Sequence, residues 1–207
     1  IQQFILSGTK AYRRTDDTDL GQVVDKDFGA GIGTLDGVVF QGGFAGATPS
    51  LYVCAGVTGQ LWERASNGTW TQCALPSGFM AHRVEVVGVE LWAADWANSV
   101  VRKVTSDPKV AANWSGPIFV GSPSVKISAL RQSGNQLTIF KENGSLFTLN
   151  SDGSTNDLFP GLRVPINSDN GYRAAAWLGA IWFRAGPAFY RLDVPSNQLT
   201  PSGPGRM

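Results

Sequence analysis

The sequence predicts an all-β protein, and its repeats indicate a β-propeller of about five four-stranded blades. A short aromatic pattern returns about every forty-five residues, which is the spacing expected for blades of roughly 40 to 50 residues. Each copy has a hydrophobic run, a turn that usually contains glycine, and a second hydrophobic run, as in an antiparallel hairpin. No segment shows a 3.6-residue period over about eleven residues or more, so no substantial helix is expected.

Five copies of the pattern follow one another along the chain. In order, they are Phe4-Ile-Leu-Ser-Gly with Ala11-Tyr12, Leu51-Tyr-Val-Cys-Ala-Gly with Leu61-Trp62, Leu91-Trp-Ala-Ala-Asp-Trp with Val100-Val101, Leu137-Thr-Ile-Phe with Leu146-Phe147, and Ile181-Trp-Phe-Arg-Ala-Gly with Phe189-Tyr190. We therefore expect a single domain, 1–207, with approximate blades at 1–28, 29–78, 79–123, 124–166 and 167–207.

The fourth copy shows the expected order of strands within a blade. Ile127 to Arg131 is predicted as the inner strand, and Gln136 to Lys141 as the second strand. Asn143-Gly144 between apolar runs predicts a tight hairpin turn into the third strand, Ser145 to Asn150. A short outer strand is expected at Asn156 to Phe159.

The two ends of the repeat array differ. The first copy begins at its second strand, and the last copy ends in Pro201-Ser-Gly-Pro-Gly-Arg-Met207. Two alternatives stay open: a closed five-bladed ring with a degenerate first blade, or a five-blade segment of a larger propeller. The absence of an initiating Met suggests that Ile1 is an internal or processed start.

Composition limits the class of protein and its partners. With 43% apolar and 16% charged residues, and apolar stretches broken by Gly, Pro, Ser and Asn, a soluble globular chain without a spanning helix is expected. The net charge of +1, without long runs of either sign, favours neither nucleic acid nor a membrane as a partner. Cys54 and Cys73 are expected on strands too far apart for a disulfide, hence as free thiols.

Aromatic residues beside polar ones supply the candidate binding residues. Trp92 and Trp96 are four residues apart on an expected strand and would share a face, with Asp95 and Asn98 toward the turn. Flat rings next to a carboxylate or amide can hold a pyranose, although most of the seven tryptophans are expected in the core. Trp70 and Trp114 follow polar turns and are expected to be more accessible than Trp62, Trp92 or Trp182. The candidate ligand-binding residues are Trp70, Asp95, Trp96, Asn98, Asn113 and Trp114.

No metal or cofactor site is expected. The carboxylates Asp16, Asp17 and Asp19 lack the spacing of a calcium loop and are predicted to lie in a solvated turn. Gly29-Ala-Gly-Ile-Gly33 lacks the following helix that a dinucleotide site requires.

A catalytic site is not expected either. The single histidine, His82, is predicted to be structural, and no serine lies in a nucleophile-elbow motif. Glycoside hydrolysis needs two carboxylates, for which Glu85, Asp36 and Asp169 are the candidates near inner strands. Because no recognisable hydrolase motif surrounds them, the chain is expected not to be an enzyme.

The stretch from Ile127 to Leu192 carries Gln136-Leu-Thr-Ile-Phe-Lys-Glu-Asn-Gly-Ser-Leu-Phe-Thr-Leu, Leu158-Phe-Pro-Gly-Leu-Arg, Asp169-Asn-Gly and Trp177-Leu-Gly-Ala-Ile-Trp-Phe. It resembles the propeller repeats of virion and tail-associated proteins of tailed bacteriophages. This resemblance covers about a third of the chain closely.

The resemblance implies a structural or attachment module of a virion, made in a bacterial host cytoplasm, or otherwise an extracellular protein. Its implied partners are other virion proteins, copies of itself, or a host surface glycan. One alternative is a free-standing lectin with a sugar site between each pair of blades, although no polar set repeats in every copy. The other alternative is a propeller glycoside hydrolase.

Overall fold

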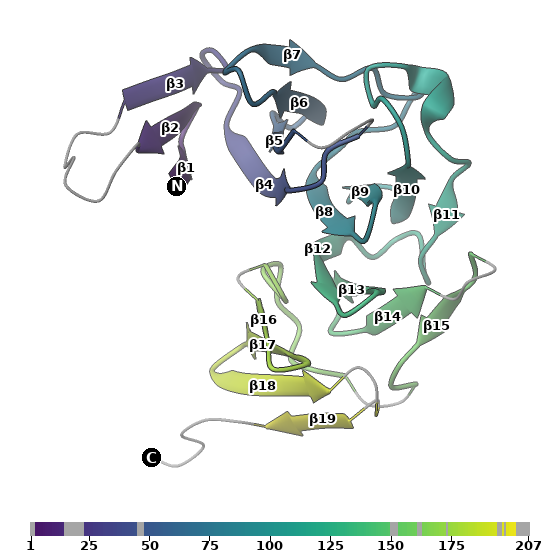
Figure 1. The fold of residues 1–207 in the computed structure, drawn as a ribbon. Coiled ribbons are helices and arrows are strands. Elements are labelled where there is room, and N and C mark those ends of the chain that lie inside the picture. The colour runs from purple at the N-terminus through teal and green to yellow at the C-terminus, as the bar shows by residue number, and fades with distance from the viewer. Residues whose placement is uncertain are drawn as a thin grey trace. The chain divides into compact units, whose positions relative to one another are not determined.

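The computed structural model describes most of the chain as short β-strands (Figure 1). The described residues are 3–14, 23–44, 48–149, 153–160, 163–172, 174–193, 196 and 198–201. They form nineteen strands and one short 3-10 helix, η1 (Ala111–Asn113). No helix within these ranges is long and apolar enough to span a membrane.

The strands form five antiparallel sheets, and strands adjacent in sequence are adjacent in each sheet. The first sheet has three described strands, β1 (Gln3–Ser7), β2 (Lys10–Arg14) and β3 (Val23–Asp27). The second sheet contains β4 (Thr34–Phe40), β5 (Ser50–Ala55), β6 (Gln60–Arg64) and β7 (Trp70–Gln72). The third contains β8 (Arg83–Val87), β9 (Glu90–Asp95), β10 (Val100–Val104) and β11 (Ile118–Phe119).

The last two sheets repeat the same order. The fourth sheet contains β12 (Ile127–Ser133), β13 (Gln136–Lys141), β14 (Leu146–Leu149) and β15 (Thr155–Asp157). The fifth contains β16 (Ala175–Trp177), β17 (Ala180–Ala185), β18 (Ala188–Asp193) and β19 (Gln198–Pro201). This series of small meander sheets confirms the predicted all-β propeller class. The blade boundaries and the closure of the ring stay predictions.

The chain divides into two compact units. Unit 1 comprises Ile1–Ala93 with Lys103–Ser115, and unit 2 comprises Ala94–Arg102 with Gly116–Met207. In unit 1, the apolar face of the first sheet packs against β5 through Ala11, Leu51 and Val53. Phe28 joins this core and meets the rings of Trp62 and Trp70 edge to face.

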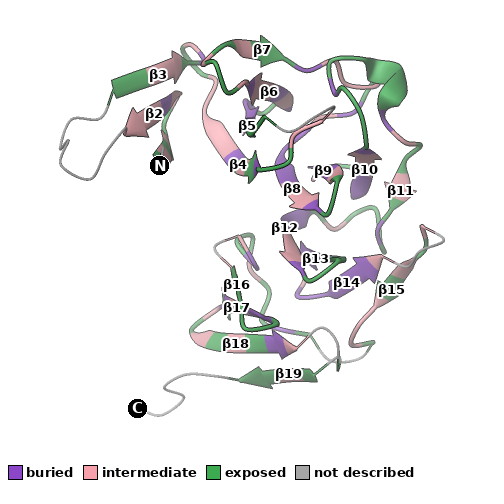
Figure 2. Cartoon of the chain, viewed as in Figure 1, coloured by how far each residue is buried: buried purple, intermediate pink, exposed green. Residues whose placement is uncertain are grey.

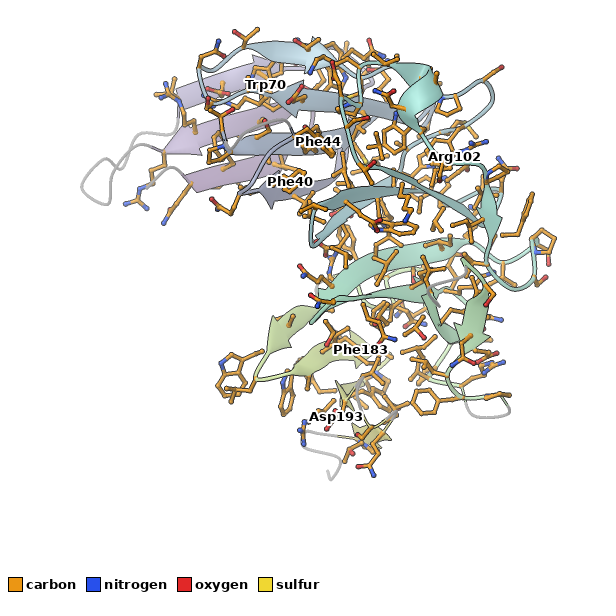
Figure 3. All side chains as sticks on the ribbon, turned by 45° about the vertical axis from the view of Figure 1, so that its right-hand side comes forward. Phe40, Phe44, Trp70, Arg102, Phe183 and Asp193 are labelled. Carbon is orange, nitrogen blue, oxygen red and sulfur yellow. The ribbon has the colours of Figure 1, made fainter. Side chains whose placement is uncertain are left out.

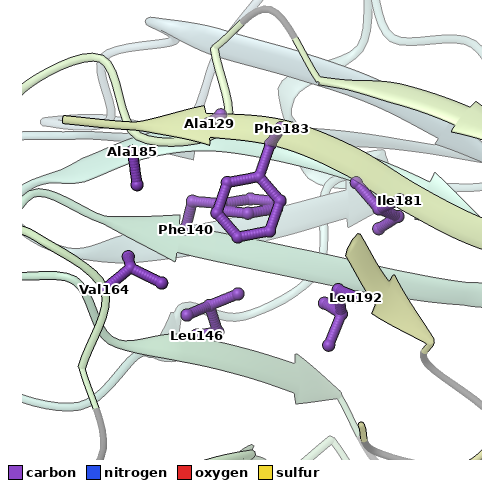
Figure 4. Packing of buried hydrophobic residues seen from close by; sticks show 8 residues of the cluster. All are labelled: Ala129, Phe140, Leu146, Val164, Ile181, Phe183, Ala185 and Leu192. Atoms are coloured by element: carbon purple, nitrogen blue, oxygen red, sulfur yellow. The ribbon is translucent and has the colours of Figure 1, made fainter. Parts of the chain in front are cut away.

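The core of unit 2 lies between the fourth and fifth sheets. Side chains alternate along β17, so that Ile181, Phe183 and Ala185 enter this core while the intervening residues point the other way. Phe183 meets Phe140 of β13 edge to face at a centroid distance of 4.9 Å (Figure 4). Apolar burial of this kind stabilises a small sheet that could not fold alone.

Both cysteines are free and buried, as expected from their strands. Burial raises the pKa of each thiol, which keeps Cys54 and Cys73 in the unreactive protonated form at neutral pH.

Candidate functional site

Asp95 and Asn98 lie in one turn and are hydrogen-bonded to each other. Asp95, at the end of β9, is buried, and its Oδ1 accepts hydrogen bonds from the backbone N–H groups of Ala97 (3.1 Å) and Asn98 (3.3 Å). Its Oδ2 accepts a bond from Asn98 Nδ2 at 2.7 Å. The carboxylate therefore closes the hairpin between β9 and β10, which is the local role that Asp often takes in turns.

Trp96 does not share a strand with Trp92, contrary to the sequence-based expectation. β9 ends at Asp95, so the alternation of faces along a strand does not extend to Trp96. Trp96 is half-buried, and Lys126 Nζ lies 5.9 Å from its ring centre. Trp92 is buried and donates from Nε1 to Glu90 Oε2 at 3.1 Å.

Trp70 belongs to a buried ion cluster in unit 1. Its Nε1 donates to Asp25 Oδ2 at 2.8 Å, and the guanidinium of Arg64 binds both oxygens of the same carboxylate at 2.5 and 3.1 Å. Arg13 lies 3.2 Å from Asp25 Oδ1. Burial raises the pKa of Asp25, but the hydrogen bonds from Arg64 and Trp70 and the nearby positive charges outweigh it, so this pKa lies below its ordinary value. Trp70 therefore stabilises the ionised carboxylate.

Asn113 and Trp114 hold the loop that precedes them. Asn113 Nδ2 donates to the carbonyl oxygen of Asp107 at 2.8 Å, and Trp114 Nε1 donates to that of Pro108 at 3.3 Å. Trp114 is only 6% exposed and packs against the ring of Phe79. The expectation that Trp114 is accessible is wrong, because its indole is buried against Phe79 and bonded to the carbonyl oxygen of Pro108.

The candidate acid and base residues also have local partners. Asp36 lies within β4 and accepts bonds from the backbone N–H groups of Gly37 and Val84. Glu85 accepts a bond from its neighbour Val86. His82 is fully buried, with Nε2 2.9 Å from the carbonyl oxygen of Val57.

No group of His, Cys, Asp and Glu among the described residues could hold a metal ion. The Asp16, Asp17 and Asp19 cluster lies outside the described residues.

A pocket of about 380 Å³ lies in unit 2 and is lined by Asn167, Asp169, Tyr172 and Arg184. Asn167 Oδ1 accepts a bond from the backbone N–H of Asp169 at 2.8 Å, and the backbone N–H of Tyr172 donates to the carbonyl oxygen of Asp169 at 3.0 Å. The buried side chain of Asn170 anchors this loop. The pocket thus presents an amide, a carboxylate, a phenol and a guanidinium on a folded loop beside β17.

The fifth sheet carries an uncovered face beside this pocket. The strand register places on one side, opposite the core, the residues that we call the aromatic face: Trp177, Trp182, Arg184, Phe189 and Arg191. The rings of Trp177 and Trp182 are 6.3 Å apart, and Arg191 lies 5.8 Å from the ring of Trp182. Trp177 is 63% exposed, and the exposed residues of β16 and β18 are visible in Figure 2. Asp193, labelled with Phe183 in Figure 3, pairs with Arg191 at 3.6 Å.

Equivalent positions in the second, third and fourth sheets are buried. The second residue of β5, β9, β13 and β17 is in each case a buried Leu or Ile. The fifth residue of the same strands is buried in β5, β9 and β13 but exposed in β17; these residues are Cys54, Ala94, Phe140 and Arg184. The fifth sheet therefore has an arginine where these three sheets bury a small or apolar side chain. In the first sheet, no residue of β1 is buried.

Trp182 also differs from the equivalent tryptophan of the third sheet. Trp92 donates to Glu90, two residues earlier, but Ala180 occupies that place before Trp182. The buried Nε1 of Trp182 has no hydrogen-bond partner among the described residues. Sequence reasoning missed Arg184 and Trp182 as site residues, although an alignment of the five copies places Arg184 in an otherwise uncharged column.

Comparisons with known proteins agree on the fold. Neither the protein-family models nor the curated proteins contain a match to the sequence. Among solved structures, a streptogramin B lyase matches with a TM-score of 0.72 at 12% identity over 94% of this chain. Virginiamycin B lyase from Staphylococcus aureus matches with a TM-score of 0.67 at 11% identity, covering 96% of this chain and 68% of the lyase. The WD40 repeats of RRP9 match with a TM-score of 0.57 at 13% identity, covering 84% of this chain and 52% of that chain.

This chain spans 62% of the length of the streptogramin B lyase. The expectation that the chain is not an enzyme is contradicted by the two lyases, which are enzymes with the same fold. At such low identity the likeness shows the fold alone. Solved structures with this fold also include proteins in complexes with other proteins.

Proposed function

We propose that this protein is an attachment module that binds carbohydrate on the aromatic face of the fifth sheet. The observation that carries this proposal is the exposed Trp177 beside Trp182, on a sheet whose Arg184 also lines a polar pocket. The virion setting, with a host surface glycan as ligand, follows from the sequence resemblance described above.

The two parts of the site suit the two surfaces of a sugar. The C–H face of a pyranose packs flat against an indole ring, which combines a large apolar area with a polar edge. The hydroxyl groups of the sugar need donors and acceptors, which Asn167, Asp169 and Tyr172 supply in the pocket. A volume of about 380 Å³ lies within the range of small-molecule sites, roughly 300 to 1,000 Å³.

The position of the aromatic face favours one sugar site over a site in every blade. The equivalent side chains Cys54, Ala94 and Phe140 are buried, so the second, third and fourth sheets do not present this face. The exposed residues of β1 in the first sheet include no tryptophan. We therefore expect one ligand per chain, whereas a lectin with sites between all blades would bind several.

A protein partner, including another virion protein or a second copy of this chain, is the second candidate. The observation that favours it is that the same face is buried in the second, third and fourth sheets. Trp and Arg are also enriched in the energetic centres of protein interfaces. Sedimentation of the purified chain at increasing concentration detects self-association, which Trp177→Ala would weaken.

Hydrolysis by two carboxylates is not proposed for this pocket, because Asp169 is the only carboxylate among its described lining residues.

A glycan array followed by titration calorimetry tests the proposal. We expect a sugar-specific signal with a stoichiometry of one, and a loss of at least tenfold in affinity for Trp177→Ala, about 1.4 kcal/mol. Phe119→Ala is the matched control, because Phe119 is an equally exposed aromatic residue on β11. Absence of any glycan signal, or equal effects of the two substitutions, would reject the proposal.

A further inference from the structure

We infer that the pocket selects sugars that carry a carboxylate, and that Arg184 binds this group; the inference rests on the proposed function and names its ligand class. Arg184 is exposed at a position where the second, third and fourth sheets bury Cys54, Ala94 and Phe140. A guanidinium covered there by apolar protein would be a costly unpaired charge. The arginine therefore suits an anionic occupant better than an apolar one.

The guanidinium of Arg184 is held in one orientation, and its terminal N–H groups are available as hydrogen-bond donors. Its Nε donates to the carbonyl oxygen of Gly186 at 2.8 Å, which fixes the plane of the group. Its Nη1 and Nη2 make no hydrogen bond to the residues that the structure describes. A planar fork with two free N–H groups matches a carboxylate, which accepts two parallel hydrogen bonds.

The neighbouring charges determine how such a ligand lies. Arg191 is paired with Asp193 and stacked on Trp182, so its charge is already partly compensated. Asp169 repels a carboxylate and accepts hydrogen bonds from hydroxyl groups. The acid group of the ligand is therefore directed to Arg184, and its hydroxyl groups to Asp169 and Asn167.

The spacing along β17 places Arg184 close to Trp182 on the aromatic face. Trp182 and Arg184 are two residues apart on one face, which corresponds to about 7 Å. One sugar ring with its substituents extends over this length. Its ring can thus stack on Trp182 while its carboxylate reaches Arg184.

The chemical class of the ligand matters because an isolated ion pair in water contributes little to binding affinity. An exposed pair of charges strengthens binding by about fivefold at most. A carboxylate held in two hydrogen bonds and joined to a stacked ring gains more, because the ring contact has already restricted its motion. An acidic sugar is therefore favoured over a free inorganic anion.

The test uses the full chain with an uronic-acid disaccharide and with the same disaccharide after reduction of its carboxyl to a hydroxymethyl group. Titration calorimetry should show at least tenfold tighter binding of the acidic form at low salt. The preference should decrease as the salt concentration rises, because the pair is exposed. Poly-L-glutamate is the peptide arm of the experiment and should bind at least tenfold more weakly than the uronate.

Arg184→Met separates the inference from the proposed function. This substitution keeps the apolar stem and should abolish the preference, so that the variant binds the acidic sugar and the reduced sugar with equal affinity. Arg163→Met removes the same charge elsewhere in unit 2 and should keep the preference. Equal binding of the two sugars by the unsubstituted protein, or binding of neither together with a glycan-array signal for another sugar, overturns the inference alone; binding of neither together with no signal on the array overturns the proposed function as well. Poly-L-glutamate binding as tightly as the uronate would overturn the choice of a sugar.

Discussion

Lys141 donates from Nζ to the hydroxyl of Ser99 at 2.6 Å, and both side chains are only 1% exposed. The same ammonium donates to the carbonyl oxygens of Val120 and Ser122. No carboxylate is bound to it among the described residues. Three neutral oxygens thus satisfy the three N–H groups of a buried lysine in unit 2, while its charge has no counter-ion.

The first prediction concerns the stability of this buried ammonium. Burial lowers the pKa of Lys141 from 10.5 to about 8. Between these values the unfolded chain binds more protons than the folded chain, so the free energy of unfolding rises with pH. The full rise from this residue approaches about 3 kcal/mol above pH 10.5, from about 1.4 kcal/mol per pKa unit. Urea unfolding between pH 7 and 10.5 measures this rise in the free energy of unfolding.

Lys141→Met provides the reference for that measurement. All other titrating groups are common to both proteins, so the difference between their unfolding free energies isolates Lys141. We expect the unsubstituted protein to gain stability relative to Lys141→Met as the pH rises past 8. A difference that stays constant with pH would show that the lysine titrates normally.

The second prediction concerns Trp70 and Asp25. Trp70→Phe keeps the ring and removes the N–H donor, which should lower the unfolding free energy by about 1 to 2 kcal/mol at pH 7, since the acceptor is charged. The folded pKa of Asp25 is depressed, so its stabilisation is present above the ordinary value of 3.8 and is lost as the pH falls through the folded pKa. The difference from Trp70→Phe should therefore shrink below about pH 3.8.

Trp62→Phe is the control, because Trp62 Nε1 donates to the neutral Oε1 of Gln60. The loss of unfolding free energy caused by Trp62→Phe should not change with pH over the acidic range. If both substitutions showed the same pH profile, the role of Trp70 in holding the carboxylate would be refuted.

The fold was predictable because it depends on regular signals. Apolar runs at two-residue alternation and the turn Asn143-Gly144 are properties of short segments, and they survive in the structure as strands and a hairpin. The repeat then constrains the architecture, since a single small sheet cannot bury its own apolar face.

The site was less predictable because it depends on which side chains have already found partners. Asp95 and Trp70 are residue types that often bind sugars. In the structure, Asp95 is hydrogen-bonded to Asn98 within its own turn, and Trp70 is hydrogen-bonded to the distant Asp25. Conversely, Arg184 becomes a candidate binding residue only when its exposure is compared with the burial of Phe140 at the equivalent position of the fourth sheet. Sequence spacing gives the face of a strand, but it does not give what covers that face.

The third prediction concerns the glycine that supports the pocket loop. Gly171 has φ +72°, and an added Cβ would lie 2.3 Å from the ring of Phe140 in the core. Gly171→Ala should therefore destabilise unit 2 by more than about 3 kcal/mol, through steric overlap as well as backbone strain. Gly134→Ala has a similar φ of +58° with nothing within 4 Å, and should cost only about 1 to 2 kcal/mol. Urea unfolding of both variants measures the difference, and equal costs would contradict the packing described here.

The fourth prediction concerns the hairpin that carries Trp177. Trp177 pairs with Ala180, which leaves Leu178 and Gly179 as a two-residue turn with φ values of 49° and 75°. Positive φ at both positions is the requirement of a type I′ turn, in which Asn-Gly is the preferred pair. Leucine is strained in this conformation, and here its side chain is 78% exposed. Leu178→Asn should raise the free energy of unfolding by about 0.5 to 1 kcal/mol. Leu178→Ala, which removes the side chain without the conformational preference of asparagine, should leave it nearly unchanged. Urea unfolding distinguishes the two, and a loss of stability in Leu178→Asn would mean that the leucine makes a contact that outweighs its backbone strain.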